Sequence, residues 1–248
     1  MQWKTALTKV TQNGEIVRGY NLSDLMRQKS FVETIFLLIR GKLPTVQETT
    51  MMNALFTAAI DHGVGVASTM AARLSASAGN SLHTSLAAGV LSLGEHHGLA
   101  IEGAARFFQE NNNTEVVAEL LLKMKADKKR VPGFGHRLLT HDQRAELLFT
   151  LAKENGLYGK HCAFAEKVAE ELNKTASKKL PMNIDGAMGA IISDMGFDWR
   201  AAQGIFIIAR VPGLVAHIYE EIASDEGLRR LEENEEAYIG ETEKNITQ

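Results

Sequence analysis

The sequence predicts an all-α fold with little β-strand, on three observations. Only four prolines occur in 248 residues. The long stretches between them are rich in Ala, Leu, Met, Glu and Lys, which lose little entropy in a helix. Apolar residues recur there at helical spacing, and no short strands alternate with helices as a doubly wound sheet or barrel requires. No linker or internal repeat interrupts the chain, so residues 1–248 predict a single domain.

The N-terminal part predicts a hairpin followed by a helix. Asn13-Gly14 is a turn dipeptide, so residues 8–20 predict the only strands of the chain. Residues 29–42 predict a helix with one apolar face, because apolar residues recur there every three or four positions. That face comprises Phe31, Ile35, Leu38 and Ile39, and the helix stops at Gly41 before Pro44.

The next segments predict helices that pack closely. Residues 46–60 predict a helix that ends at Asp61-His62-Gly63. Residues 66–92 are crowded with Ala, Ser and Gly, and small side chains let helices approach closely. We therefore expect two central helices broken near Gly79-Asn80, with part of this region at a homodimer interface.

The C-terminal half predicts further helices. Residues 163–173 show an apolar stripe at a spacing of four and predict an amphipathic surface helix. Residues 187–195 and 199–222 predict buried helices, the second bent near Pro212-Gly213. The acidic tail from 224 to 248 predicts a solvated helix with a frayed end.

Composition excludes several classes of function. Twenty-seven Lys and Arg against 30 Asp and Glu give a net charge of −3, which argues against a nucleic-acid-binding protein. The single Cys162 cannot form an intramolecular disulfide, as expected of a cytoplasmic protein. No apolar run suggests a membrane span or a signal peptide. We expect Cys162 to be a buried packing residue rather than a nucleophile.

Three glycine-containing segments place ionisable residues at junctions between helices. They cover 94–98, 132–137 and 181–186, and they offer His97, His136 and Asp185. Glycine permits the unusual backbone angles that let a ligand approach. Each segment alone could be an ordinary connection with a capping side chain. Three together favour a shared site.

Metal and nucleotide motifs are lacking. Eight histidines occur, but no HExxH and no Cys/His cluster, so we expect no metal site. No GxxxxGK[ST] occurs, and the Gly-Phe-Gly-His run does not match GxGxxG. Nucleotide hydrolysis and dinucleotide chemistry are therefore not expected.

Several motifs, in order, resemble the citrate synthase superfamily, and most closely its short citryl-CoA lyase branch, which also forms the C-terminal module of ATP-citrate lyase. The resemblance implies an all-helical core with a smaller part that closes over the substrates, and association at least as a homodimer. The motifs are Arg18-Gly19-Tyr20, Gly41-Lys42-Leu43-Pro44, Asp61-His62-Gly63, His97-Gly98-Leu99-Ala100, Gly133-Phe134-Gly135-His136-Arg137, Asn183-Ile184-Asp185-Gly186 and Arg210.

By position, the resemblance implies three catalytic roles. His97 resembles the histidine that holds the thioester carbonyl of acetyl-CoA, and His136 the one that exchanges a proton with the oxygen of oxaloacetate or citrate. Asp185 resembles the carboxylate that moves the methyl proton. A carboxylate suits this step if a histidine N–H stabilises the enolate. The residues that resemble carboxylate ligands are His62, Arg144 and Arg210.

The resemblance also implies coenzyme A as part of a thioester substrate or product. Because the protein is net negative, the site of the CoA phosphates must be locally basic. The nearest candidates are Arg137, Lys178 and Lys179, with backbone amides around Gly133 and Gly135. The alternative is that Lys178 and Lys179 only solvate a turn.

Two features bear on the direction of the reaction. Only 16 residues, 45–60, lie where full-length citrate synthases carry a long helical insertion, which indicates the lyase branch. His97 lies in HHGLA, which resembles the synthase loop. We expect a citryl-CoA lyase that yields acetyl-CoA and oxaloacetate. The alternatives are a short citrate or 2-methylcitrate synthase and a non-catalytic CoA-binding homologue.

Overall fold

The computed structural model describes residues 2–114, 116–135, 142–175, 180–224 and 226–244. Within these residues eleven α-helices and three short strands occur, so the all-α prediction is confirmed. The strands are β1 (Thr8–Thr11), β2 (Gly14–Val17) and β3 (Tyr20–Asn21). The helices are α1 (Leu22–Gln28), α2 (Phe31–Arg40), α3 (Val46–Ala59), α4 (Ala67–Ser77), α5 (Leu82–Leu91), α6 (Ala100–Asn111), α7 (Val117–Ala126), α8 (Gln143–Glu154), α9 (Lys160–Thr175), α10 (Ile184–Asp194) and α11 (Ala202–Ser224).

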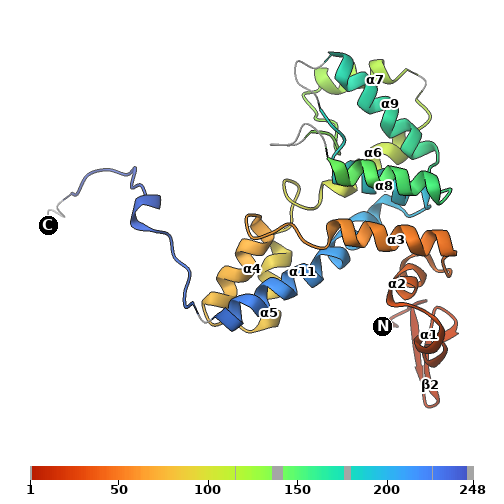
Figure 1. Ribbon diagram of the computed structural model, residues 1–248, viewed down its shortest axis with the longest axis horizontal. Helices are drawn as coiled ribbons and strands as arrows, with labels where there is room; N and C mark the ends of the chain where they lie inside the picture. Colours follow the sequence, from red (N-terminus) through yellow and green to blue (C-terminus); the bar gives the residue numbers. More distant parts are fainter. Residues whose placement is uncertain (1, 115, 136–141, 176–179, 225, 245–248) are drawn as a thin grey trace.

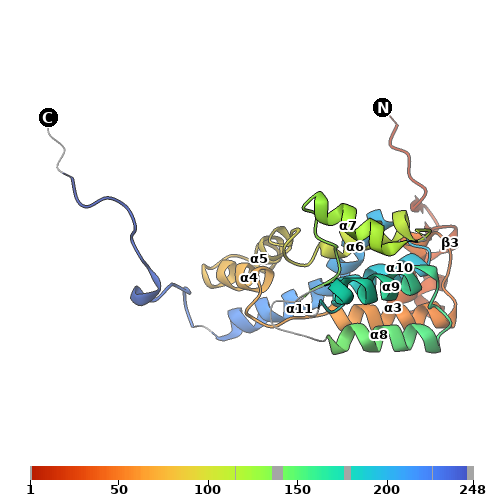
Figure 2. The ribbon, with the colours of Figure 1, turned by 90° about the horizontal axis from the view of Figure 1, so that it is seen from above.

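Helix α10 lies at the centre of the main helical body. It packs against α6, α8, α9 and α3, and its residues from Gly186 to Ser193 are buried. Helix α11 runs from this body to a second group made with α4 and α5, so that the long helix joins the two groups (Figures 1 and 2). The connection that follows α3 and the connection that precedes α6 therefore lie where the two groups meet.

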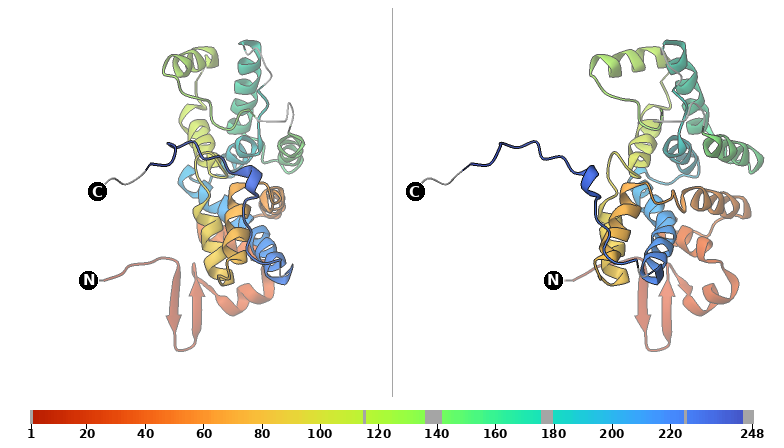
Figure 3. Two further views of the ribbon diagram at one scale, coloured as in Figure 1. Left: turned by 90° about the vertical axis from the view of Figure 1, so that its left-hand side faces the viewer. Right: turned by 60° about the vertical axis from the view of Figure 1, so that its left-hand side comes forward.

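The predicted hairpin is present, with its turn displaced by one residue. Strands β1 and β2 are antiparallel, and Thr11 pairs with Gly14, so that Gln12 and Asn13 form the turn. Gly14 has a φ of 125°, a value that residues with a side chain rarely adopt. The hairpin lies at the opposite end of the molecule from α7 and α9 (Figure 3).

Helix α2 begins and ends as the sequence predicts, but its buried face differs. Ser30 and Glu33 form a capping box at its start, and Gly41 ends it in the left-handed conformation. Phe31, predicted on the apolar face, is 79% exposed. The buried residues are Ile35, Phe36 and Leu37, because the helix is covered on two sides. Phe36 lies in the main core with residues of α3 and with Phe197, and Leu37 lies in a separate cluster with Val17 and Leu25.

The small residues of α4 and α5 pack as predicted. The two helices are broken near Gly79, which has a φ of 85°. A Cβ on Gly89 of α5 would lie 3.0 Å from the Ala72 Cβ and 3.1 Å from the Ser68 carbonyl oxygen of α4. Any larger residue at Gly89 would push the helices apart.

Helix α11 continues through Pro212 without a break and is more apolar than the sequence analysis allowed. By length and composition alone Trp199–Ser224 could span a membrane, with a mean hydropathy of 1.5. It contains the buried Arg210, and it packs against α3, α4, α5 and α6. This packing buries 44% of its apolar window and so accounts for part of its apolar character.

The tail departs from the prediction. Helix α11 ends at Ser224, and of residues 226–244 only Glu233–Glu235 form a single 3₁₀ turn. The tail extends away from the helices (Figures 1 and 2). It exposes the apolar side chains of Leu228, Leu231, Tyr238 and Ile239.

Candidate active site

The segment before α6 is a tight turn that presents His97. The Gly94 and His97 backbones exchange two hydrogen bonds, of 2.8 and 2.9 Å. Gly98 follows with a φ of 80°, and a Cβ there would lie 2.8 Å from Leu93 Cδ2 and from Phe206 Cε1. Only glycine fits this position, because both the backbone angle and the space exclude a side chain.

The other two predicted loops pair with each other. Gly135 N–H donates to the Pro181 carbonyl at 2.7 Å, and Asn183 N–H donates to the Gly133 carbonyl at 3.0 Å. The Asn183 side chain donates to the Gly135 carbonyl at 3.0 Å and accepts from Gly186 N–H at 3.1 Å, so that it caps α10. The Gly133–Gly135 segment is thereby fixed against the start of α10.

Asp185 lies in the first turn of α10, beside this junction. Its Oδ1 is buried and has no hydrogen-bond partner among the described residues. Burial raises the pKa of Asp185 to about 6, while the positive charges of Arg144 and Arg210 act to lower it and the Asp142 carboxylate to raise it. The carboxyl group can therefore hold or release a proton near neutral pH.

His97 is held by a residue that the sequence analysis did not single out. Ser68, fully buried in the first turn of α4, lies with its Oγ 2.8 Å from His97 Nε2. Burial, with the nearby positive charges of Arg210 and His62, lowers the pKa of His97 below its usual value. The ring is thus neutral at pH 7 and can donate one N–H to a ligand.

Two arginines face the same region. Arg210 of α11 donates from Nε to the Ala59 carbonyl at 2.8 Å, and its buried Nη1 has no partner among the described residues. Arg144, in the first turn of α8, forms a two-pronged pair with the buried Asp142, at 3.1 and 3.0 Å. Both guanidinium groups act electrostatically on Asp185. Buried polar atoms without partners are typical of a site that receives a polar ligand.

The structure thus brings five predicted residues close enough for their charges to interact. They are His62, His97, Arg144, Asp185 and Arg210. His62 lies in the connection between α3 and α4, and its charge acts on His97. Arg144 and Arg210 act on each other and on Asp185. His136, Arg137, Lys178 and Lys179 lie outside the described residues.

Two positioning side chains were missed by the sequence analysis. Ser68 holds His97 from 29 residues away along the chain, and Asp142 holds Arg144. Ser68 is one of many small residues in α4, and no local pattern distinguishes it. Asp142 directly precedes α8 and accepts a hydrogen bond from Arg144 N–H, as a helix cap does. From the sequence, Asp142 could have been identified only as a candidate helix cap, and not as a residue of the site.

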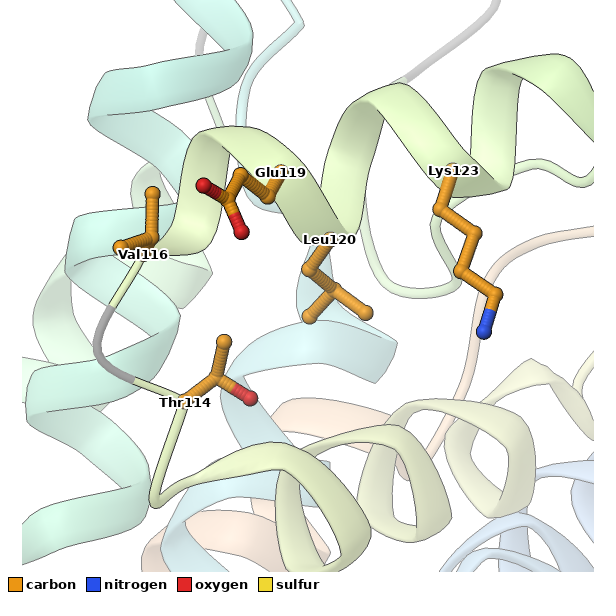
Figure 4. A pocket seen from close by; sticks show the side chains of 5 residues that line it. All are labelled: Thr114, Val116, Glu119, Leu120 and Lys123. Carbon is orange, nitrogen blue, oxygen red and sulfur yellow. The ribbon is translucent and has the colours of Figure 1, made fainter.

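One hollow adjoins the site, and another lies away from it. A groove of about 440 Å³ runs between α8 and α9. Its lining includes Asp142, Pro181 and Met182, which adjoin the paired loops. The second hollow, of about 410 Å³, lies under α7, where Leu120 points toward Thr114 and Lys123 points aside (Figure 4). It is lined by no residue of the site.

The part of the chain that the structure describes contains neither a metal-binding group of side chains nor a reactive thiol. No group of three His, Cys, Asp or Glu side chains there could hold a metal ion. Cys162 is fully buried, and burial raises the pKa of its thiol, so the sequence interpretation as a packing residue holds.

Comparison with known proteins places this geometry in a family. Residues 47–232 match the family model of the citrate synthase C-terminal domain. A solved citryl-CoA lyase from Hydrogenobacter thermophilus is 44% identical with a TM-score of 0.94, covering 99% of this chain and 97% of that chain. An ATP citrate lyase from Methanothrix soehngenii, solved with citrate and coenzyme A, is 26% identical with a TM-score of 0.87, covering all of this chain and 43% of that chain.

Curated sequences agree. The ATP-citrate synthase beta chain protein 1 of Arabidopsis thaliana is 29% identical over 230 residues, which cover 86% of this chain. The chain spans about a third of the length of that relative, 36%. The family model covers most of the chain, and the fold agrees with that of a solved relative over nearly the whole of both chains. The chain belongs to the citrate synthase family.

Proposed function

We propose that this chain is a citryl-CoA lyase, which cleaves citryl-CoA to oxaloacetate and acetyl-CoA. The observation that carries the proposal is the buried Asp185 carboxyl, with a pKa of about 6, in one neighbourhood with a neutral His97 and two arginines. The likeness to a citryl-CoA lyase over nearly the whole of both chains supports it.

Cleavage needs one base and one acid. His136, by its sequence position, takes the proton from the citryl hydroxyl. The bond between the carbinol carbon and the methylene carbon then breaks, and its electron pair remains on the methylene carbon of the acetyl-CoA enolate. Asp185, protonated at the start, gives its proton to that carbon. The enzyme ends with a proton on His136 and none on Asp185, and atoms and charges balance.

His97 stabilises the enolate oxygen. Ser68 has one hydroxyl proton, and its partner among the described residues is His97 Nε2. When Ser68 donates, the His97 proton resides on Nδ1, which is then free to donate to the thioester oxygen. Because His97 is neutral, it donates a hydrogen bond without surrendering a proton to the substrate.

The substrate's carboxylates bind to the arginines. Arg210 Nη1 is buried without a partner among the described residues, and a carboxylate would satisfy it. Arg144 is already oriented by Asp142 and offers its remaining N–H groups. His62 contributes the third ligand. We further propose that CoA phosphates bind at Arg137, Lys178 and Lys179, and that the Gly133–Gly135 loop contacts the thioester arm.

A short citrate or 2-methylcitrate synthase is the second candidate, since the same residues run the reaction in both directions. The family model itself is that of citrate synthase. The two differ in whether the citryl-CoA thioester is hydrolysed. A non-catalytic homologue is less favoured, because a buried Asp185, whose Oδ1 has no hydrogen-bond partner among the described residues, costs stability that a purely structural protein has no reason to retain.

Two assays with purified protein test the proposal. In the first, citryl-CoA is added and oxaloacetate is detected through NADH oxidation by added malate dehydrogenase. In the second, acetyl-CoA and oxaloacetate are added and free thiol is measured. A lyase releases oxaloacetate in the first and no stoichiometric thiol in the second. A synthase releases thiol continuously, and a non-catalytic homologue gives no signal in either assay.

We also propose that the protein is a homodimer formed through α4, α5 and the end of α11. These helices expose large apolar side chains in one part of the molecule. Met70 and Leu74 of α4 are 58% and 52% exposed, and Tyr219 of α11 is 69% exposed. Exposed apolar side chains on adjacent helices suit the apolar centre of a self-complementary interface.

A further inference from the structure

The segment that carries His62 is fastened to one face of α11. Arg210 Nε donates to the Ala59 carbonyl at 2.8 Å. At Gly213 an added Cβ would lie 2.2 Å from the Ile60 carbonyl oxygen, so the two backbones touch. Further along, His217 Nε2 lies 3.0 Å from Asp61 Oδ1. Positions 210, 213 and 217 share one helix face, and they meet residues 59, 60 and 61 in order.

Asp61 connects this face to the turn that holds His62. Its Oδ2 accepts a hydrogen bond from Gly63 N–H at 3.0 Å, and Gly63 has a φ of 73°. One carboxylate therefore binds α11 through one oxygen and closes the turn around His62 through the other. Burial acts to raise the pKa of Asp61, but the N–H groups of Gly63 and His62 and the His217 ring outweigh it, so the pKa is lowered.

A more distant carboxylate lies on the other side of His217. The Nδ1 of His217 lies 3.7 Å from Glu220 Oε2, and Glu220 also pairs with Arg73 of α4 at 3.0 Å. The ring is half-buried between these groups. Because the Asp61 carboxylate can only accept, Nε2 donates the one short hydrogen bond of the ring, to Asp61.

We propose that His217 is a positioning residue for the reaction, which fixes His62 in the substrate site through its hydrogen bond to Asp61. The proposal rests on the proposed function, since it assigns His62 to the binding of a substrate carboxylate. His217 does not touch the cluster of Asp185, His97 and Arg144 directly. It acts through the 61–63 turn.

A positioning role predicts a specific kinetic signature. A carboxylate contact is made in the ground state and in the transition state alike, so its loss raises KM and leaves kcat nearly unchanged. We expect His217→Leu to raise the KM for citryl-CoA by about fivefold or more, with kcat within about twofold of wild type. A residue that only stabilises the fold would lower the melting temperature and leave both constants of the folded protein unchanged.

The variant set is His217→Leu, His217→Gln and Glu220→Gln, each measured by steady-state kinetics and thermal melting at one pH. Gln places an amide N–H close to the position of Nε2, so His217→Gln should restore KM to within about twofold of wild type. Glu220→Gln removes the charge of the exposed neighbour that lies beyond hydrogen-bond distance of the ring, leaves the His217–Asp61 hydrogen bond in place, and should leave KM unchanged.

The outcomes separate this inference from the proposed function. If wild-type protein does not cleave citryl-CoA, the proposed function fails. If wild type cleaves it and His217→Leu keeps a normal KM, the positioning role is overturned while the function stands. A rise in KM that Gln does not correct would also overturn it. If His217→Leu does not fold, Asp61→Ala in a folded form must show the same rise in KM, and a normal KM there overturns the role.

Discussion

Ser68 Oγ lies 2.8 Å from His97 Nε2, a contact between the first turn of α4 and the turn before α6. Ser68 is fully buried, so its hydroxyl does not face bulk solvent. The hydrogen bond occupies Nε2 of His97, so in the function that we propose Nδ1 is the ring nitrogen that faces the substrate. It also joins the α4–α5 group to the helical body at the site.

Ser68→Ala should lower kcat for citryl-CoA cleavage by about tenfold or more, with a smaller change in KM. Without the hydroxyl, His97 loses the partner that sets its tautomer and orientation. Steady-state kinetics measures the effect. Ser92→Ala is the matched control, because the Ser92 hydroxyl donates only to Ala88 of its own helix. Equal activity of the two variants would contradict this role for Ser68.

Asp185→Asn should lower kcat by about 100-fold or more, because an amide cannot deliver a proton to carbon. The carboxyl and amide have nearly the same shape, so binding of citryl-CoA should persist and can be measured by calorimetry. Asp198→Asn makes the same chemical change at an exposed cap beside Arg200 and should leave kcat unchanged. Near-normal turnover of Asp185→Asn would exclude Asp185 as the acid.

The same substitution should stabilise the fold at neutral pH. The pKa of Asp185 is raised from 3.8 to about 6, so the folded state favours the protonated form, and ionising it costs free energy. Below about pH 4 the wild type and Asp185→Asn should be equally stable. As pH rises through about 6 the wild type alone loses stability, by on the order of 1 to 3 kcal/mol. Urea unfolding at pH 4.5 and 7.5 measures this. A pH-independent difference would mean that Asp185 is not desolvated.

The features that could be predicted from the sequence are those that depend on residues close together in the chain. The start and end of α2, the break between α4 and α5 and the three glycine-containing segments follow from residues close in sequence. Phe31 has the right spacing for a buried face and is exposed, because burial depends on which elements pack nearby. Ser68 and His217 could not be found, since their roles arise only when distant segments meet.

The junction of Gly133 and Gly186 should be intolerant of any side chain. A Cβ on Gly186 would lie 2.3 Å from the Gly133 carbonyl oxygen, and both sides of the contact are fixed backbone. Gly186→Ala should therefore cost about 2 kcal/mol or more in free energy of unfolding. Gly204→Ala is the control, because it lies in α11 with open space around it and should gain up to about 1 kcal/mol. Urea denaturation distinguishes them, and similar values for both would refute the close contact.

The proposed homodimer should depend on the apolar face of α4. Leu74 is 52% exposed, and a carboxylate placed there would be buried without a partner if a second copy covers it. Leu74→Glu should therefore shift the protein from dimer to monomer at micromolar concentration, as measured by light scattering. Leu122→Glu on α7, where Leu122 is 65% exposed and far from α4 (Figure 1), should leave the dimer intact. Wild-type protein that scatters as a monomer, or a Leu74→Glu variant that remains a dimer, would place the interface elsewhere or remove it.

The kinetics of the monomer add a second test. Helix α4 carries Ser68 and packs on α11, which carries Arg210, so we expect the monomer to lose activity.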